Sequence, residues 1–233
     1  MSRLDDLLAS ESQRFVAQHP QSAILAQQSR EHWLGGVPMH WMADWGTPHP
    51  LFVREATGVT LTDVDGQRYT DFCLGDTGAM FGHSPPSIAQ ALARQGARGL
   101  TCMLPAERTA EVGAQLAALF GLPYWQITQT ATDANRYALR WARAITGRPK
   151  VLLFQGCYHG TVEETMVRRR EGRTVPREGA IGALIGTVFD SASAAVAVEF
   201  NDIAAVEAAL DHGDIGCVLY EPVMTNIGMV LPE

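Results

Sequence analysis

Residues 126–160 have the sequence QITQTATDANRYALRWARAITGRPKVLLFQGCYHG, and this stretch decides the fold. Its first residues belong to an apolar run that predicts a short buried strand over Trp125–Thr130. Apolar side chains then recur at helical spacing, which predicts an amphipathic helix over Asp133–Thr146. A second strand is predicted at Val151–Phe154, so the order of elements is strand, helix, strand.

Small and hydroxylated residues stand where the predicted helix begins, namely Thr130, Ala131 and Thr132. The first N–H groups of a helix have no intrahelical partner, and the aligned peptide dipoles make that end partly positive. Small side chains let an anion approach these amides, so the pattern indicates a phosphate site. A capping box from Thr130 to Asp133, with no ligand, is the alternative, and the local sequence alone favours it.

Strands and helices continue to alternate after this stretch. The further predictions are a strand at Ala194–Val198, a helix at Ile203–Leu210 and a strand at Cys217–Glu221. Such alternation predicts an α/β fold with a mostly parallel sheet and helices on both faces. Ligands of these sheets bind beyond the carboxyl ends of the strands. Tyr158 and Glu221 follow predicted strand ends, as Thr130 does, and we expect all three to share one site.

The N-terminal part has a different pattern. Leu4–Ser29 is polar and compatible with helix, which suggests an N-terminal arm, and Leu51–Phe72 predicts short strands with a tight turn at Asp65-Gly66. Helices are predicted at Ser87–Gly99 and Glu107–Phe120. We therefore expect an arm with a small-domain segment over residues 1–104, and the first, incomplete part of a large ligand-binding domain over residues 105–233.

Several motifs in this order resemble those of class III aminotransferases, which are pyridoxal phosphate enzymes of fold type I. The matching segments are Leu61–Phe72, Gly82-His83, Thr130–Asn135, Thr146-Gly147, Tyr158-His159-Gly160, Phe200-Asn201-Asp202 and Glu221-Pro222-Val223. The nearest subgroup is the glutamate-1-semialdehyde aminomutase-like branch, which also includes β-amino-acid transaminases. The resemblance implies amino-group transfer, with small amino and keto compounds as substrates and a homodimer as the complete enzyme.

The resemblance also implies roles for single residues. Thr130–Thr132 would hold the phosphate of pyridoxal 5'-phosphate, and Tyr158 would stack on its pyridine ring, with a packing tyrosine as the alternative. His159 would orient Tyr158 or border the pocket. Glu221 would form a hydrogen bond near the ring or hold a neighbouring side chain, and a solvated acid is the alternative. Asn226 matches a family asparagine near the phenolic oxygen of the cofactor.

Substrate residues are less well defined. His40, Trp41 and Asp76 are candidates for the substrate pocket, with packing roles as the alternative. Aminomutases of this branch usually have a tryptophan where Asp76 stands and a substrate-binding arginine where Met42 stands. We therefore favour transamination of an amino acid or amine, and keep intramolecular transfer of the aminomutase type as the alternative.

The chemistry of the family needs a lysine that binds the cofactor as a Schiff base. The only lysine of this sequence is Lys150, which precedes a predicted strand and would lie at the wrong end of the sheet. We therefore expect no catalytic residue in this chain and interpret it as an N-terminal fragment. The hypotheses are a truncated enzyme, a split enzyme, or a non-catalytic remnant that binds the cofactor or a partner. An incomplete sheet would expose an apolar edge and favour association.

The composition limits which partners, metal sites and cellular compartments we expect for this protein. The net charge of −7 and the lack of a basic stripe argue against nucleic acid as a partner. The histidines and four isolated cysteines show no metal-ligand spacing, and the thiols indicate a reducing compartment. No signal peptide or membrane span is predicted. We expect a cytoplasmic enzyme without a metal site, and expect the Arg168-Arg169-Arg170 run to be a solvated loop.

Overall fold

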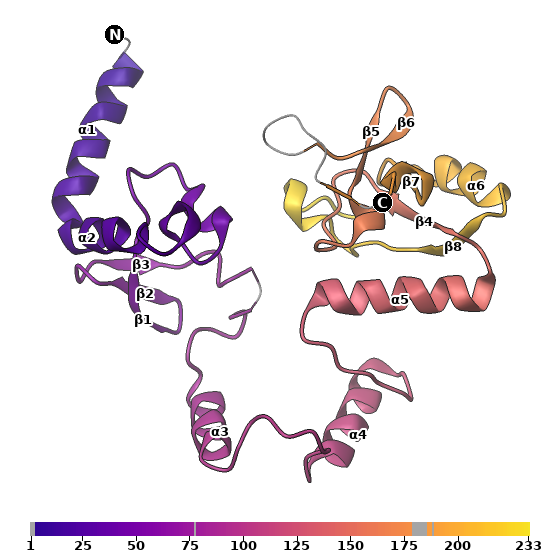
Figure 1. Cartoon of the computed structure of the whole chain (residues 1–233), viewed down its shortest axis with the longest axis horizontal. Helices are drawn as coiled ribbons and strands as arrows, with labels where there is room; N and C mark the ends of the chain where they lie inside the picture. Colours follow the sequence, from indigo (N-terminus) through magenta and orange to yellow (C-terminus); the bar gives the residue numbers. More distant parts are fainter. Residues whose placement is uncertain (1–2, 77, 179–185, 188) are drawn as a thin grey trace. The chain divides into compact units, whose positions relative to one another are not determined.

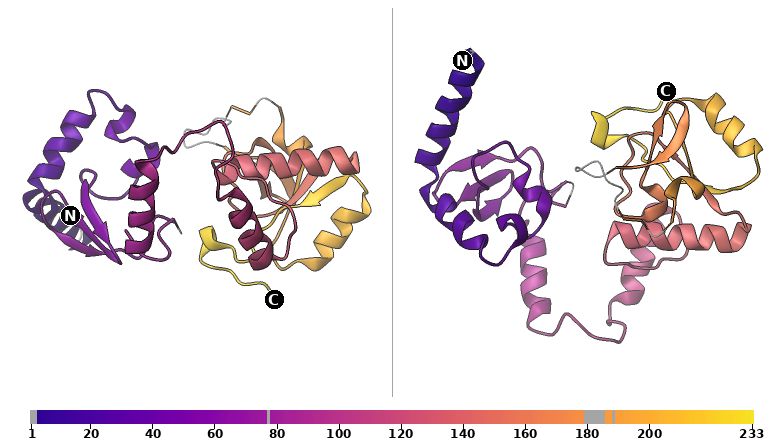
Figure 2. Two further views of the ribbon diagram at one scale, coloured as in Figure 1. Left: turned by 90° about the horizontal axis from the view of Figure 1, so that it is seen from below. Right: turned by 45° about the horizontal axis from the view of Figure 1, so that its top comes forward.

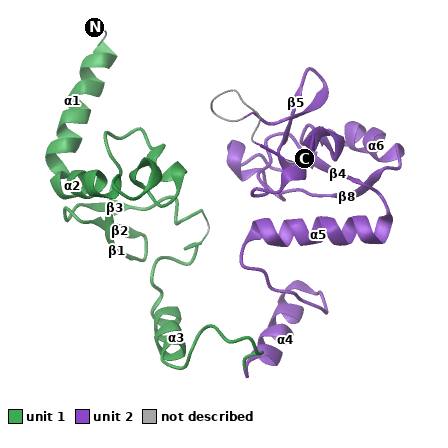
Figure 3. Ribbon diagram, in the orientation of Figure 1, with its two compact units in different colours: residues 1–106 green, residues 107–233 purple. Residues whose placement is uncertain are grey.

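The computed structural model describes residues 3–76, 78–178, 186–187 and 189–233. The chain forms two compact units, residues 1–106 (unit 1) and residues 107–233 (unit 2), each of which is described by itself (Figure 3).

Unit 1 contains helices and a small antiparallel sheet (Figure 1). Its elements are α1 (Arg3–Gln18), α2 (Pro20–Ser29), the 3-10 turns η1 (Leu34–Gly36) and η2 (His40–Ala43), β1 (Val53–Thr57), β2 (Thr60–Asp63), β3 (Arg68–Thr70) and α3 (Pro86–Gly96). The strands pair in the order β1-β2-β3, with Thr57 opposite Thr60 and Leu61 opposite Tyr69. The predicted strands are confirmed, and the turn before β3 uses Gly66 at a φ of 85°.

The hairpin motif of unit 1 is joined to the arm by a buried polar network. Asp63 accepts hydrogen bonds from the Gln67 amide at 2.8 Å and from the Tyr69 hydroxyl at 2.9 Å. The same hydroxyl lies 2.7 Å from His19 Nε2, at the end of α1. In the turn, Asp65 accepts the amide of Ser22, at the start of α2, at 3.0 Å. Burial, and then the hydrogen bond to Asp63, raises the pKa of Tyr69 to about 12.

The end of the hairpin is fastened to the Gly82-His83 turn. His83 Nε2 lies 2.7 Å from Asp71 Oδ2, and this contact holds the pKa of the Asp71 carboxyl below its usual value. The backbones of Gly58 and His83 exchange two hydrogen bonds in an isolated antiparallel bridge. A Cβ at Gly82 would lie 3.3 Å from the Gly58 backbone, so the close approach favours glycine there.

Unit 2 is an α/β layer structure (Figure 1). Its elements are α4 (Thr109–Phe120), α5 (Ala131–Thr146), β4 (Lys150–Phe154), η3 (Glu163–Thr165), β5 (Val167–Arg170), β6 (Arg173–Pro176), η4 (Ser191–Ser193), β7 (Ala195–Val198), α6 (Ile203–Asp211), β8 (Ile215–Val218) and η5 (Thr225–Ile227). Strands β7, β4 and β8 pair in that order and are parallel, with Leu152 opposite both Val196 and Val218. The predicted α/β fold with a parallel sheet is confirmed.

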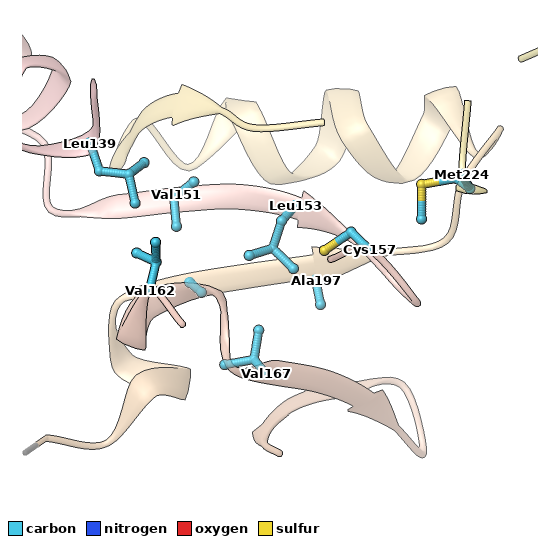
Figure 4. Close-up of a cluster of buried hydrophobic side chains, with 9 residues drawn as sticks. Leu139, Val151, Leu153, Cys157, Val162, Val167, Ala197 and Met224 are labelled. Carbon is cyan, nitrogen blue, oxygen red and sulfur yellow. The ribbon is translucent and has the colours of Figure 1, made fainter. Parts of the chain in front are cut away.

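Two apolar clusters lie on opposite faces of this sheet, because successive side chains of a strand point to opposite faces. One cluster contains Leu139, Val151, Leu153, Cys157, Val162, Val167, Ala195, Ala197 and Met224 (Figure 4). The other contains Leu152, Val198, Ala209 and Ile215. Leu139 belongs to α5 and Ala209 to α6, so one helix covers each face, and Figure 2 shows α5 lying along β8.

Three sequence predictions are wrong in detail. Trp125–Thr130 is not a strand: none of the described strands pairs with it, and Ile127 is 80 % exposed. The strand predicted at Cys217–Glu221 is displaced towards the N-terminus, because Ile215 already pairs with Lys150.

The third correction concerns Arg168-Arg169-Arg170, which forms most of β5 rather than a solvated loop. The two-residue turn Glu171-Gly172, both at positive φ, folds β6 back onto β5. Arg168 also forms an ion pair with Glu178 at 2.7 Å.

Candidate functional site

The N-terminus of α5 is capped by Thr130. The Thr130 hydroxyl accepts the amide N–H of Asp133 at 3.1 Å and donates to the Asp133 carboxylate at 2.9 Å. Arg136 lies 3.6 Å from the same carboxylate and partly offsets its charge. The capping alternative therefore describes the side chain of Thr130 correctly, and the hydroxyl of Thr130 is already engaged within the helix.

The next two residues leave the helix end open to a ligand. None of the described residues accepts a hydrogen bond from the amide N–H of Ala131 or Thr132. Thr132 Oγ1 accepts the amide N–H of Thr161 at 3.2 Å, which leaves the hydroxyl proton of Thr132 for another acceptor. Two amides and one hydroxyl therefore remain at the positive end of the helix dipole, and this combination suits a phosphate.

The loop that follows β4, residues 158–161, packs directly against this helix end. A Cβ on Gly160 would lie 2.0 Å from Thr132 Oγ1, so a larger residue at position 160 requires one of the two to move. Asn135, one turn into α5, donates its side-chain amide to the carbonyl of His159 at 3.1 Å. These contacts bring the 158–161 loop beside the open amides.

The same loop is tied to the end of β8. The amide N–H of Tyr158 donates to Glu221 Oε2 at 3.2 Å, and the Thr225 hydroxyl donates to Glu221 Oε1 at 3.1 Å. Because β4 and β8 are parallel neighbours, their carboxyl ends meet at one edge of the sheet, and Tyr158 and Glu221 both follow those ends. The candidate site is thus assembled at that edge from α5 and two strand ends.

Burial alternates along the loop. Cys157 and His159 are 4 % and 7 % exposed, whereas Tyr158 between them is 57 % exposed. Burial, the largest cause, raises the pKa of the Cys157 thiol to about 11, so this cysteine is not a nucleophile at neutral pH. The two buried neighbours anchor the chain, and the Tyr158 ring projects from it.

His159 is held as a neutral ring. Burial lowers its pKa, while the charge of Glu221 and a hydrogen bond to the Leu219 backbone act in the opposite direction. Its Nε2 atom is buried and has no hydrogen-bond partner among the described residues. The ring therefore lies inside the protein, close to the Leu219 backbone.

The structure places the predicted cofactor residues in unit 2 and the predicted substrate residues in unit 1. Thr132, Tyr158 and Glu221 are linked as described, whereas Asn226 lies exposed in η5. The predicted substrate residues all belong to unit 1: His40 and Trp41 lie in η2, and Asp76 lies in a turn where it accepts a hydrogen bond from the Cys73 thiol at 3.3 Å.

Sequence reasoning missed the contacts that assemble the site. Thr161 and Thr225 were not predicted as site residues, although their bonds to Thr132 and Glu221 hold it together. The contact of Thr161 has no local signal, because its partner is 29 residues away. The contact of Thr225 with Glu221, four residues away, depends on the turn into η5, which the sequence did not predict. Asn135 was detectable, since it lies three residues after Thr132 and therefore on the same helix face.

Lys150 lies at the opposite edge of the sheet. It begins β4, its amide donates to the carbonyl of Asp214, and its ammonium group lies 2.8 Å from the Asp214 carboxylate. The 158–161 loop follows the other end of that strand. This placement agrees with the interpretation that Lys150 begins a strand and does not reach the candidate site.

The residues that the structure describes contain neither a metal-binding cluster nor a membrane-spanning helix. No group of three or more His, Cys, Asp or Glu side chains is arranged to hold a metal ion in the part of the chain that the structure describes. Among those same residues, no helix has the length and apolar character needed to cross a membrane.

Comparison with known proteins identifies the family. The family model for aminotransferase class-III matches residues 41–233. A glutamate-1-semialdehyde 2,1-aminomutase of Methanocella arvoryzae is 33 % identical over 217 residues, which cover 91 % of this chain and 49 % of that protein.

Solved structures agree with this result. A glutamate-1-semialdehyde-aminomutase from Pseudomonas aeruginosa PAO1 is 52 % identical with a TM-score of 0.92, covering 99 % of this chain and 50 % of that one. An omega-transaminase from Sphaerobacter thermophilus is 26 % identical with a TM-score of 0.77, covering 91 % and 49 %. The chain spans about half the length of these relatives. It belongs to the class III aminotransferase family of fold type I, in the branch that contains the glutamate-1-semialdehyde aminomutases.

Proposed function

We propose that this chain supplies the phosphate-binding and ring-binding part of a pyridoxal phosphate enzyme that transfers amino groups. The observation that supports this proposal most is the open N-terminus of α5, where the amides of Ala131 and Thr132 and the Thr132 hydroxyl face no described acceptor. A lysine-to-alanine variant of the similar P. aeruginosa protein was solved in complex with PMP, the pyridoxamine form of the cofactor.

The residues present fit such a cofactor. The close approach of Gly160 to Thr132 leaves the helix end beside the loop free of side-chain bulk, and a phosphate can accept from the two open amides. Tyr158 is exposed beside this point and offers an aromatic face to a pyridine ring. When bound, the cofactor withdraws electrons from the substrate carbon that loses a proton.

Other residues would have supporting roles at this site. The Thr130 cap fixes the first turn of α5, and with it the direction of the amides of Ala131 and Thr132. His159 anchors the loop from inside the protein. Asn226 is proposed near the phenolic oxygen of the cofactor, and its position in exposed η5 leaves its side chain accessible.

The cofactor proposal can be tested with pyridoxamine 5'-phosphate, whose binding needs no Schiff-base lysine. Calorimetric titration should show that it binds this chain more tightly than pyridoxamine, and that inorganic phosphate competes. Thr132→Val removes one donor to a charged group and should weaken binding about tenfold or more. Thr101→Val, an exposed threonine of unit 1, is the matched control. Equal affinity for the two ligands, or no effect of Thr132→Val, would contradict the proposal.

The reaction itself is proposed for the full-length protein, because the chain spans about half the length of its relatives. Transfer of an amino group from an amino acid or amine to a keto acid or aldehyde is our first proposal. It rests on Asp76 and Met42, which stand where the aminomutases of this branch usually have other residues. His40, Trp41 and Asp76 are the proposed substrate residues of this reaction.

Intramolecular transfer on glutamate-1-semialdehyde is the second candidate. It is supported by the 52 % identity to a protein of that name. The two reactions are distinguished by supplying the full-length gene product either with glutamate-1-semialdehyde alone or with an amine and a keto acid. Conversion of the single substrate without a second one would establish the mutase and exclude our first proposal.

We also propose that the full-length enzyme is a cytoplasmic homodimer. The family resemblance supports the dimer, and four free thiols, among them the exposed Cys73 and Cys102, support a reducing compartment. Light scattering on the purified full-length product, expected to give twice the monomer mass, tests the dimer.

A further inference from the structure

We propose that Glu221 is a positioning residue that acts through the backbone of Tyr158 and sets the direction of the Tyr158 ring. The proposal concerns the same site as the proposed cofactor function and rests on it for the role of the ring. It assigns Glu221 a contact with the protein rather than a direct contact with the cofactor.

The carboxylate of Glu221 is directed by two donors of the protein. Oε2 accepts the amide N–H of Tyr158 at 3.2 Å, and Oε1 accepts the hydroxyl of Thr225 at 3.1 Å. Two donors on different oxygens fix the plane of a carboxylate, and hydrogen bonds to an ionised group are stronger than those between neutral groups. Glu221 therefore clamps the 158–161 loop to the segment that follows β8.

The ring of Tyr158 needs such a clamp because its side chain has no anchor of its own. It is 57 % exposed, and its hydroxyl has no hydrogen-bond partner among the described residues. The backbone is fixed on either side of it, by buried Cys157 and by buried His159, whose carbonyl accepts from Asn135. Among these contacts, the bond to Glu221 is the one made by the amide of Tyr158 itself.

The remaining charged and titratable neighbours are consistent with this role. The charge of Glu221 opposes the burial that lowers the pKa of His159, and it adds to the burial that raises the pKa of Cys157, so the carboxylate lies near both flanking residues. The charge of Arg177 partly offsets this rise in the pKa of the Cys157 thiol. Glu221 thus contacts the Tyr158 amide directly and lies near the residues on either side of it, which is the position expected of a residue that orients the loop.

Amide hydrogen exchange can measure the clamp without any cofactor. The chain has five tyrosines, so labelling with 15N-tyrosine gives five amide signals, and Tyr158→Phe identifies that of Tyr158. Glu221→Ala should accelerate exchange of the Tyr158 amide about tenfold, as expected for loss of one hydrogen bond to a charged group. Glu221→Gln keeps an acceptor oxygen and should retain most of the protection. Glu207→Ala, on the exposed face of α6, is the control.

A second arm measures the affinity for pyridoxamine 5'-phosphate. A positioning role predicts weaker binding for Glu221→Ala and near-normal binding for Glu221→Gln. Thr225→Val removes only the second donor, should give an intermediate exchange rate, and replaces Glu221→Ala if that variant fails to fold. Unchanged exchange of the Tyr158 amide in Glu221→Ala overturns the proposal, as does a loss of affinity in Glu221→Gln equal to that in Glu221→Ala. If wild-type chain does not bind the ligand, the proposed cofactor function fails, and the exchange data still decide whether the clamp exists.

Discussion

The two units of this chain are stabilised in different ways. Thirteen of the fifteen buried apolar residues among the described part of the chain belong to unit 2, and only Ala26 and Val37 belong to unit 1. Unit 2 also buries four polar or charged side chains, but in unit 1 the buried polar side chains His19, Ser22 and Asp63 outnumber the buried apolar ones, and they join its helices to its sheet. A parallel sheet covered on both faces is specified by apolar burial, whereas a small antiparallel hairpin needs directional polar contacts to fix its neighbours.

The family motifs of the two units also have different roles. The hairpin motif of unit 1 supplies Asp63, Asp65 and Asp71, and each of them accepts hydrogen bonds within the unit. The Tyr158-His159-Gly160 motif of unit 2 begins with an exposed ring and ends with a glycine against an open helix end. The first motif therefore maintains structure, whereas the second is the one that we propose presents groups to a ligand.

The largest effect on stability is expected from removing part of the apolar core of unit 2. Leu152 is fully buried at the centre of the middle strand, so Leu152→Ala should destabilise unit 2 by about 2–5 kcal/mol. Hydrogen exchange measured by mass spectrometry should show lost protection in peptides of β4, β7 and β8, with peptides of unit 1 unchanged. Loss of protection in both units together would show that they do not unfold separately.

The corresponding test in unit 1 removes a buried acceptor. Asp63→Ala leaves the Gln67 amide and the Tyr69 hydroxyl without this partner, at a cost of about 1–3 kcal/mol. Asp63→Asn keeps one acceptor oxygen and should cost less, while Asp6→Ala on exposed α1 is the control. Hydrogen exchange measured by mass spectrometry should show lost protection in peptides of unit 1, with peptides of unit 2 unchanged. Unchanged protection in Asp63→Ala would refute the polar network as the basis of this unit.

The buried histidine of unit 2 predicts a dependence on pH. The pKa of His159 is lowered from its ordinary value of 6.5, so below pH 6.5 the unfolded chain binds a proton that the folded chain does not. The free energy of unfolding of unit 2 should therefore be highest above pH 6.5 and fall as the pH decreases below it. Urea unfolding above and below pH 6.5 should show a smaller decrease for His159→Asn than for wild type. His32→Asn, an exposed histidine, should behave as wild type.

The smallest expected effect concerns the cap that unit 1 provides for α2. Asp65 accepts the amides of Gln21 and Ser22 at 2.7 and 3.0 Å, so Asp65→Ala should release the first turn of α2 and leave the strands protected. Asp65→Asn retains a side-chain oxygen that can cap the helix. Exchange of the Gln21 and Ser22 amides, followed by NMR, is the readout. Equal exchange in the alanine and asparagine variants would exclude the cap.

Local patterns predicted most of the elements of both units. The helix at Ala131–Thr146 and the strand at Lys150–Phe154 follow from apolar spacing, and the turn at Gly66 follows from an Asp-Gly pair. The wrong predictions concern segments whose structure depends on whether a neighbouring strand pairs with them. Trp125–Thr130 has apolar residues but no described strand beside it, and the arginines of β5 form a strand because β6 pairs with them.

By itself, the sequence determined the α/β class and the family, and it located the helix end that we propose as a phosphate site, because periodicity and short motifs are local properties of the chain. Only the tertiary structure decided that Thr130 serves as a cap, that Thr132 and Gly160 meet, and that Glu221 holds the amide of Tyr158. Tyr158 and Glu221 are 63 residues apart in sequence. Their contact exists because two parallel strands end at the same edge of one sheet, and no local pattern specifies which strands become neighbours.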